Sequence, residues 1–187
     1  RRTLRRTPQW TVLPAADVLG VDKELGYTLS TDKYDTKQAQ GHFITEDMEV
    51  NPVDGHGVLP PIDFGESMKN VYALGGDTEI VEYSDHEVHL SAHGNGKGRG
   101  VYIAGLPYSY VNTRILLRSM YYAAAREGDM KKWYADNIYC EVHAYPETGK
   151  YAVVNNSSKT QVSTVYDGQG NGTGMELKPC EIRWFSM

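Results

Sequence analysis

Short apolar runs separated by turn-forming residues dominate the chain, so most of the predicted elements are strands. Residues Ala15–Gly20 predict a helix of one or two turns, with Gly20 as its C-cap. Ser84-Asp85 lies between two apolar runs and predicts a hairpin. In the first two thirds of the chain, strands are predicted at residues 25–29, 42–44, 70–74, 78–83, 86–92 and 101–106.

Two segments of this first part have a distinct pattern. Residues 51–64 are rich in proline and glycine and predict an exposed loop. Val101–Leu106 is a nearly unbroken apolar run, which is typical of a strand buried on both faces of an α/β sheet.

The clearest helical periodicity lies between Thr113 and Arg126. Asn112 is the predicted N-cap and Gly128 the predicted end of the helix. The predicted buried stripe of this helix consists of Ile115, Leu116, Met120, Ala123 and Ala124.

After Asp136 the pattern changes to short, evenly spaced strands, which is typical of a small antiparallel sandwich. These strands are predicted at residues 138–144, 150–155, 161–166, 175–177 and 181–185. The change predicts a domain boundary near Gly128, with an α/β part at residues 1–127 and an all-β part at residues 128–187.

Composition narrows the class of protein. The 187 residues are 40% hydrophobic and 23% charged, which excludes a disordered chain. A net charge of −5 argues against a nucleic-acid partner, and no apolar run is long enough to span a bilayer. The sequence begins with four arginines in its first six residues, but Thr7-Pro8-Gln9-Trp10 stands where a secretory signal needs an apolar segment. We therefore expect a cytoplasmic protein in which Cys140 and Cys180 are free thiols.

Three kinds of candidate chemistry each have a plainer structural interpretation. The glycine-rich segment Gly94–Gly100, with Lys97 and Arg99, could contact phosphate or a sugar, but glycines between two strands favour a hairpin. His86, His89, His93 and His143 could bind a metal, but the spacing of the first three splits them across the two faces of a strand and favours solvated strand histidines. The acidic pairs considered as catalytic couples all lie in turns or strand ends that are expected to be exposed, where nothing raises the pKa of a general acid: Asp22 and Glu24, Glu46 and Asp47, Asp63 and Glu66, and Glu79 and Glu82.

The remaining candidates are hydroxyls, sequons and aromatic rings. Ser30, Ser67 and Ser119 lack a nucleophile elbow, and the sequons at Asn155, Asn156 and Asn171 have no meaning in a cytoplasmic chain. One aromatic set could form either a platform for sugar stacking or a seam between a helix and the sandwich: Trp133, Tyr134, Tyr139, Tyr145, Tyr151 and Trp184. The residues alone identify no catalytic constellation.

Several stretches resemble the C-terminal portion of the galacto-N-biose/lacto-N-biose phosphorylases, also called 1,3-beta-galactosyl-N-acetylhexosamine phosphorylases. The resemblance extends from about Ala15 to the end, and Arg1–Leu13 resembles nothing in that family. The stretches that carry it are residues 17–24, 30–34, 62–74, 96–108, 144–156 and 177–184.

The resemblance implies a bacterial, cytoplasmic enzyme that uses phosphate to split beta-1,3-linked galactosyl-N-acetylhexosamines with inversion, without a metal or organic cofactor. It implies a catalytic barrel, which is absent from this chain, then an amidotransferase-like (flavodoxin-like) α/β domain and a C-terminal β domain. Residues 1–127 would be part of that central domain and residues 128–187 the β-sandwich domain.

We therefore assign no catalytic, cofactor-binding or metal-binding residue to this chain. The expected role is support of the missing barrel of the same polypeptide, which would bind most of the disaccharide and phosphate, together with contacts in a homo-oligomer. The fragment alone is expected to be inactive. The alternatives are a free-standing carbohydrate-binding or assembly module, and an independent enzyme that uses the glycine-rich loop.

Overall fold

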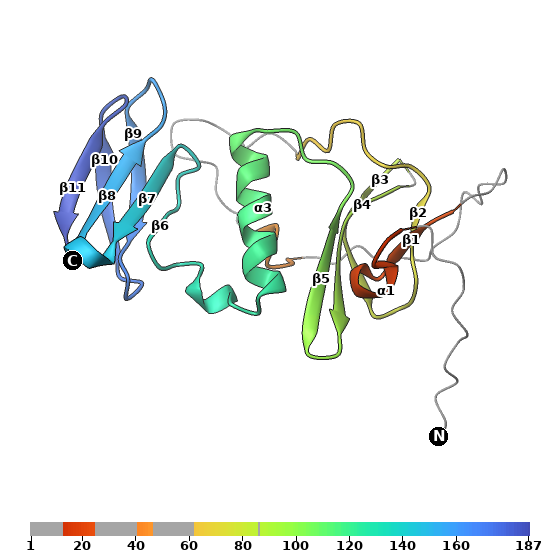
Figure 1. Ribbon diagram of the computed structural model, residues 1–187. Coiled ribbons are helices and arrows are strands. Elements are labelled where there is room, and N and C mark those ends of the chain that lie inside the picture. Colours follow the sequence, from red (N-terminus) through yellow and green to blue (C-terminus); the bar gives the residue numbers. More distant parts are fainter. Residues whose placement is uncertain (1–12, 25–40, 47–61, 86) are drawn as a thin grey trace. The chain divides into compact units, whose positions relative to one another are not determined.

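The computed structural model describes residues 13–24, 41–46, 62–85 and 87–187 (Figure 1). The chain divides into two compact units. The first unit consists mainly of Asp63–Pro107 and part of the N-terminal region, and the second mainly of Tyr108–Tyr122 and Arg126–Met187. The described strands form small sheets, and all of their pairings are antiparallel. Within the described part of the chain, none of the helices has the length and apolarity needed to cross a membrane.

The first unit contains a two-stranded and a three-stranded sheet. The elements are α1 (Ala16–Leu19), β1 (Val21–Lys23), β2 (Val71–Ala73), β3 (Thr78–Ser84), β4 (Glu87–Asn95) and β5 (Gly98–Ile103). β1 pairs with β2, and β3, β4 and β5 pair in chain order. The predicted hairpin at Ser84-Asp85 is confirmed, and Asp85 has the positive φ of 52° that a tight turn requires.

The glycine-rich segment forms the β4–β5 hairpin, one of the two interpretations that the sequence offered. Asn95 pairs with Gly98, which leaves Gly96 and Lys97 as the turn. Gly96 has a φ of +61° at the first turn position, a conformation that glycine adopts without a steric penalty.

The prediction that Val101–Leu106 is a strand buried on both faces is wrong. β5 ends at Ile103 and lies at the edge of its antiparallel sheet, and its residues alternate between buried and half-buried positions. The unbroken apolar run misled the prediction because Val101 and Ile103 are apolar residues on the less buried face of an edge strand.

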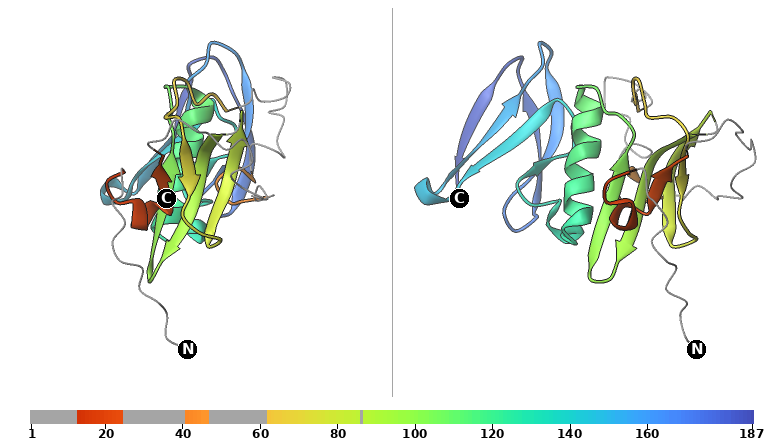
Figure 2. Two further views of the ribbon diagram at one scale, coloured as in Figure 1. Left: turned by 90° about the vertical axis from the view of Figure 1, so that its right-hand side faces the viewer. Right: turned by 45° about the vertical axis from the view of Figure 1, so that its right-hand side comes forward.

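Helix α1 packs against β5 at a position that only glycine can occupy. As predicted, Gly20 ends this helix, with a φ of +70° and its N–H bonded to the carbonyl oxygen of Ala16. A Cβ on Gly100 would lie 2.1 Å from the carbonyl oxygen of Val18, so the backbones of the helix and strand are in direct contact. Figure 2 shows the short helix beside the β4–β5 hairpin.

A small apolar core lies between the sheets of this unit. It is formed by Val21, Val71, Ile80, Val88 and Tyr102, all at most 6% exposed. Burial raises the pKa of the Tyr102 hydroxyl to about 12, with a smaller contribution from the negative charge of Glu87. This hydroxyl therefore stays protonated over the range in which the protein works.

In the second unit, helix α3 (Tyr110–Ala123) begins and ends a few residues earlier than predicted. Asn112 is not the N-cap: its N–H donates to the Ser109 hydroxyl at 3.0 Å, the bond that an N-cap serine accepts from the third helical residue. The helix does not end at Gly128 either. Ala125 adopts a φ of +54°, and the Arg126 N–H bonds to the Tyr121 carbonyl, which together form a Schellman-type end.

The buried face of α3 differs from the predicted stripe. Of the five predicted residues only Ile115 is buried, whereas Leu116 and Met120 are 48% and 62% exposed. The buried face includes two arginines one turn apart, Arg114 and Arg118. Arg118 donates to the Phe43 carbonyl, lies 4.2 Å from the centre of the Phe43 ring and pairs with Glu46 at 3.1 Å.

The five strands predicted in the last third of the chain are confirmed, with small shifts at their ends. They are β7 (Cys140–Tyr145), β8 (Lys150–Asn155), β9 (Gln161–Tyr166), β10 (Gly172–Leu177) and β11 (Ile182–Ser186). A short β6 (Tyr134–Ala135) and two 3₁₀ turns, η1 (Glu127–Asp129) and η2 (Pro146–Thr148), were not predicted as such. One sheet has the order β10-β9-β6 and the other the order β11-β8-β7 (Figure 1).

The two sheets of the second unit contribute to one core. Ala135 and Val165 come from one sheet and Cys140 and Val153 from the other, with Leu177 at the end of β10. All five are at most 4% exposed. Alternate residues of β9 are buried, which is the period expected for a strand that covers a core with one face.

Three buried amide side chains and one serine connect these strands. Asn137 donates to the side-chain oxygen of Gln161 at 2.9 Å, and Gln161 donates to the Ser157 hydroxyl at 2.8 Å. Asn155 accepts from Ser157 and donates to the carbonyls of Lys159 and Lys178 at 2.8 Å. We call Asn137, Asn155, Ser157 and Gln161 the amide network. Its three amides are at most 2% exposed, so each hydrogen bond satisfies a group that burial has removed from water.

Three predictions concern the segments before residue 64. The strand predicted at His42–Ile44 is wrong, because this segment forms a turn in which Phe43 is held by Arg118. The strand predicted at residues 25–29 and most of the loop predicted at residues 51–64 lie outside the described residues.

Replacing Gly100 by alanine should destabilise the first unit by about 1–3 kcal/mol, because the new Cβ forces two backbones apart. Gly98→Ala is the matched control on the same strand. Its Cβ would meet nothing closer than the Asn95 carbonyl at 3.6 Å, and we expect little change. Hydrogen exchange of the β4 and β5 amides measures both variants, and equal effects would show that the α1 contact is not tight.

Candidate functional site

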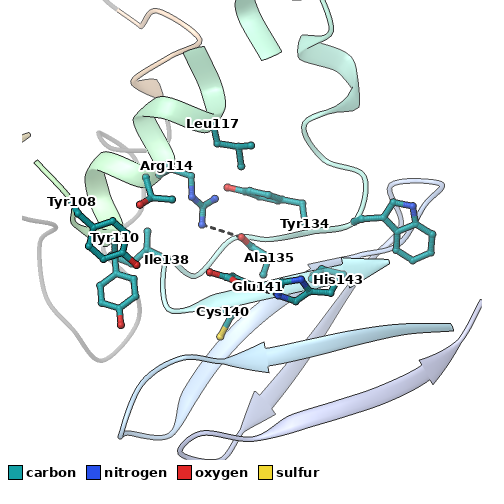
Figure 3. Close-up of a pocket in the computed structure, with 13 residues that line it drawn as sticks. Tyr108, Tyr110, Arg114, Leu117, Tyr134, Ala135, Ile138, Cys140, Glu141 and His143 are labelled. Atoms are coloured by element: carbon teal, nitrogen blue, oxygen red, sulfur yellow. Dashed lines mark hydrogen bonds and ion pairs between the residues drawn. The ribbon is translucent and has the colours of Figure 1, made fainter. Parts of the chain in front are cut away.

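The second unit contains a pocket with a volume of about 250 Å³. Its walls come from the N-terminal half of α3 and the residues before it, from the segment around β6, and from β7 (Figure 3). The lining residues are Tyr108, Tyr110, Thr113, Arg114, Leu117, Trp133, Tyr134, Ala135, Ile138, Cys140, Glu141, Val142 and His143.

Arg114 joins the helical wall of the pocket to β6. Its guanidinium donates to the Ala135 carbonyl at 3.1 Å and lies 4.6 Å from the centre of the Tyr134 ring (Figure 3). The residue is only 7% exposed. A planar guanidinium can donate in its plane and stack through its face, so Arg114 holds both the strand backbone and the ring.

The backbone of Trp133 has a φ of +54°, a conformation that residues other than glycine rarely adopt. The backbone N–H of Trp133 donates to the Asp167 carbonyl at 3.2 Å, and the centre of its ring lies 5.2 Å from the centre of the Tyr151 ring. Gly168 makes room for the indole, since a Cβ there would lie 2.4 Å from it. These contacts fix the indole against the sheet and offset the strain of its backbone.

The opposite wall is the free edge of β7. Cys140 donates its N–H to the Asn137 carbonyl and not to β8. Because alternate residues of a strand direct their backbone groups to the same side, the N–H and C=O of Val142 also face away from β8. The side chains of Glu141 and His143, two residues apart, are about half exposed and interact at 3.0 Å.

Cys140 lies at the base of this wall. Burial raises the pKa of its thiol to about 11; Asp136 adds to the rise and the Arg114 guanidinium opposes it. The thiol is therefore protonated at neutral pH, which disfavours both nucleophilic attack and metal binding at this position.

The structure divides the six aromatic residues of the predicted platform or seam among different locations. Trp133 and Tyr134 line the pocket, and Tyr139 packs edge-on against Tyr110 at its mouth, with the ring centres 4.9 Å apart. Tyr151 stacks on Phe185 and contacts Trp133 at a tilted angle. Tyr145 and Trp184 form a separate pair, with the ring centres 5.5 Å apart and the side chains about half exposed. The six residues therefore do not form one continuous platform.

Among the described residues, the histidines and acidic pairs do not come together as a metal site. Within the described ranges, no three side chains of His, Cys, Asp or Glu converge as metal ligands. His89 stacks on Phe64 and is 7% exposed, so the expectation that the strand histidines are solvated is wrong for this residue. His86 and Asp47 lie outside the described residues.

Other candidate groups have structural roles. Asp22, which the sequence placed in an exposed turn, is 4% exposed and accepts the N–H groups of Leu13 and Lys23. Asn155, the first sequon, belongs to the amide network.

Sequence reasoning missed the polar half of the pocket. Arg114 was not selected because a charged residue on a helix is usually exposed to water. Glu141 was not selected because a single acidic residue on a strand belongs to no recognisable motif. The pair Arg114 and Arg118 at a spacing of four residues, on the face that also carries Ile115, was the available indication.

Replacing Arg114 by methionine should lower the free energy of unfolding of the second unit by about 1.5–3 kcal/mol, the range for a hydrogen bond to a charged group. Arg114→Lys should recover only part of this, since lysine keeps the charge without the planar stack. Urea unfolding followed by tryptophan fluorescence measures the change. Arg126→Met, at a side chain that is 67% exposed, is the control, and an equal loss there would contradict the role of Arg114.

The two cysteines should differ in reactivity. In the folded chain at pH 8, iodoacetamide should modify the exposed Cys180 and leave the buried Cys140 unmodified, so that mass spectrometry finds one adduct. Denatured chain should carry two adducts. A Cys180→Ser variant provides the control, and its rapid modification in the folded state would show that Cys140 is accessible.

Comparisons with known proteins match the chain in two consecutive parts. Residues 7–128 match the lacto-N-biose phosphorylase central domain, and residues 133–185 match the lacto-N-biose phosphorylase C-terminal domain.

The curated relatives are phosphorylases. Two 1,3-beta-galactosyl-N-acetylhexosamine phosphorylases of Lachnoclostridium phytofermentans are 44% and 41% identical to this chain, over 91% and 96% of its length. One from Bifidobacterium longum subsp. longum is 37% identical over 90% of the chain. The matched parts are only 22%, 23% and 25% of these relatives, so the chain spans about a quarter of their length. By its sequence, the chain belongs to the lacto-N-biose phosphorylase family.

Proposed function

We propose that the chain is the C-terminal part of a bacterial phosphorylase that cleaves beta-1,3-galactosyl-N-acetylhexosamines with phosphate, giving galactose 1-phosphate and the free N-acetylhexosamine. The observation that carries this proposal is the order of the two family matches, central domain and then C-terminal domain, over residues 7–185. The names of relatives that are 37–44% identical support the substrate class.

Within that enzyme, the proposed role of this part is support and not catalysis. Inverting cleavage needs a carboxylic acid that keeps its proton until it protonates the leaving oxygen. The pKa values of Asp129, Asp167 and Glu181 are lowered by their hydrogen-bonding partners, so these groups favour the ionised form. They stabilise turns and do not have the properties of a general acid.

The proposed domain organisation is an amidotransferase-like region at residues 1–127 and a β-sandwich at residues 128–187. The second assignment is supported by two three-stranded sheets that share one core. For the amidotransferase-like region, the family match to a central domain supports only the position of its C-terminal boundary, because that match ends at residue 128.

The proposed partners are the catalytic barrel of the same polypeptide and a second subunit, in the cytoplasm. Exposed apolar side chains on two elements support such contacts. Leu116 and Met120 are 48% and 62% exposed on α3, and Ile182 and Trp184 are 58% and 57% exposed on β11. Exposed apolar groups of this size are common where another protein surface packs.

A second candidate function, a free-standing carbohydrate-binding or assembly module, is favoured by one observation. Tyr145 on β7 and Trp184 on β11 form an exposed ring pair across the intervening strand β8, a surface on which a sugar could stack.

A chimera tests the first candidate. This chain replaces the corresponding C-terminal part of the 44% identical relative, and phosphorolysis of lacto-N-biose and galacto-N-biose is measured. We expect activity within about tenfold of the parent, whereas the parent without its C-terminal part should be inactive or aggregated. The 187-residue chain alone should show no turnover. Turnover by that chain, or full activity of the truncated parent, would contradict a supporting role.

A further inference from the structure

We propose that the pocket beside α3 binds a single pyranose ring of a neutral sugar. This goes beyond the first proposed function, which assigns the chain support, and it places the sugar at a different site from the Tyr145–Trp184 surface of the second candidate, since neither of those residues lines the pocket. The inference rests on the shape of the pocket, its aromatic lining, the balance of its charges and the rigidity of its walls.

The size of the pocket suits one ring. Pockets for drug-sized molecules have volumes of roughly 300–1,000 Å³, so a volume of about 250 Å³ admits a monosaccharide and not an extended oligosaccharide. Free backbone groups at the β7 edge, such as those of Val142, add hydrogen-bonding positions along one side.

The lining combines aromatic rings with polar tips. Tyr108, Tyr110, Trp133 and Tyr134 provide ring faces and edges from two different segments. A pyranose has an apolar face formed by its C–H groups and a rim of hydroxyls, so it stacks on a ring while its rim reaches polar groups. Tyr108 is 91% exposed and is therefore available to cover a ligand at the mouth.

The charges of the pocket favour a neutral ligand with many hydroxyls. Arg114 on α3 and Glu141 on β7 bring opposite charges to the two walls (Figure 3). The Thr113 hydroxyl donates to the Ser109 carbonyl at 2.8 Å, so it can act toward a ligand only as an acceptor. An anion would be repelled by Glu141, and an apolar ligand would strip water from this half-exposed carboxylate without replacing it. Sugar hydroxyls both donate and accept, so they can satisfy both walls at once.

Contacts within the chain hold the walls in place. Arg114 is held by Ala135 and Tyr134, and Trp133 is held in its strained conformation against Gly168. Glu141 is oriented by His143 at 3.0 Å. A preformed site loses less conformational entropy on binding, which matters for a ligand as small as one ring.

The test is a titration of the 187-residue chain with D-galactose and with N-acetyl-D-glucosamine, followed by the NMR signals of the tryptophan indoles. For a ligand of this size we expect a dissociation constant on the order of 1 mM for at least one of the two sugars. The Trp133 indole signal should shift in a saturable way. The signal of Trp184, which does not line the pocket, should stay unchanged and is the internal control.

Two variants localise the binding without threatening the fold. Tyr108→Ala and Glu141→Gln, both at exposed positions, should each weaken binding by about fivefold or more. Tyr145→Ala and Glu147→Gln are the matched controls, because both residues are exposed and lie outside the pocket. These controls should leave the dissociation constant unchanged.

Several outcomes would overturn the proposal. They are no saturable shift at ~100 mM of either sugar, a shift of Trp184 in place of Trp133, equal effects of the test and control variants, or a response to inorganic phosphate alone. A shift confined to Trp184 would instead favour the exposed Tyr145–Trp184 surface. Because the titration needs no catalysis, its failure leaves the phosphorolysis result of the chimera unaffected, and the reverse also holds.

Discussion

Two buried arginines, Arg114 and Arg118, hold helix α3 in the second unit. Each donates to a backbone carbonyl, of Ala135 or Phe43, and each stacks on an aromatic ring. A helix attached in this way has a fixed rotation about its axis, because directional contacts one turn apart cannot both be kept if the helix turns. The attachment also leaves the apolar residues Leu116 and Met120 facing outward.

The pocket is a consequence of that attachment. With Arg114 engaged by β6, the first turns of α3 line the pocket together with β7. Among the described strands β7 pairs only with β8, so its other edge borders this pocket. Edge strands protected by a neighbouring element are a common way to avoid unwanted pairing, and here the protection leaves room for a small ligand.

Local patterns predicted the elements well because their causes are local. Gly20 ends α1, a hairpin turn follows Ser84, and the strands after Asp136 lie where the sequence pattern predicted them. The face of α3 could not be predicted in the same way. Hydrophobic periodicity assumes that charged residues face water. Arg114 and Arg118 are instead buried against backbone carbonyls that lie 21 and 75 positions away in the sequence.

In the candidate site, too, some features could be predicted from local sequence and others depend on tertiary structure. Trp133, Tyr134 and His143 could be selected by residue type alone, and they line the pocket. Their grouping with Tyr108, Arg114 and Glu141 depends on tertiary structure, because it needs the helix rotation and the strand edge to be known. The strand prediction for His42–Ile44 was wrong for a related reason. Phe43 in this segment packs against Arg118 of α3 and does not pair in a sheet.

The amide network gives the second unit a means of selecting one strand alignment. Apolar side chains in a small core tolerate displacement, since one methyl group can replace another at little expense. Asn137, Gln161 and Asn155 cannot be displaced in that way, because a shift of β9 by one residue would move Gln161 to the outer face and leave its partners buried without hydrogen bonds. Misaligned intermediates are thus less stable than the native alignment by several unsatisfied polar groups. The network therefore makes the native alignment of β9 more favourable than one shifted by a single residue, which an apolar core of this size would distinguish less sharply.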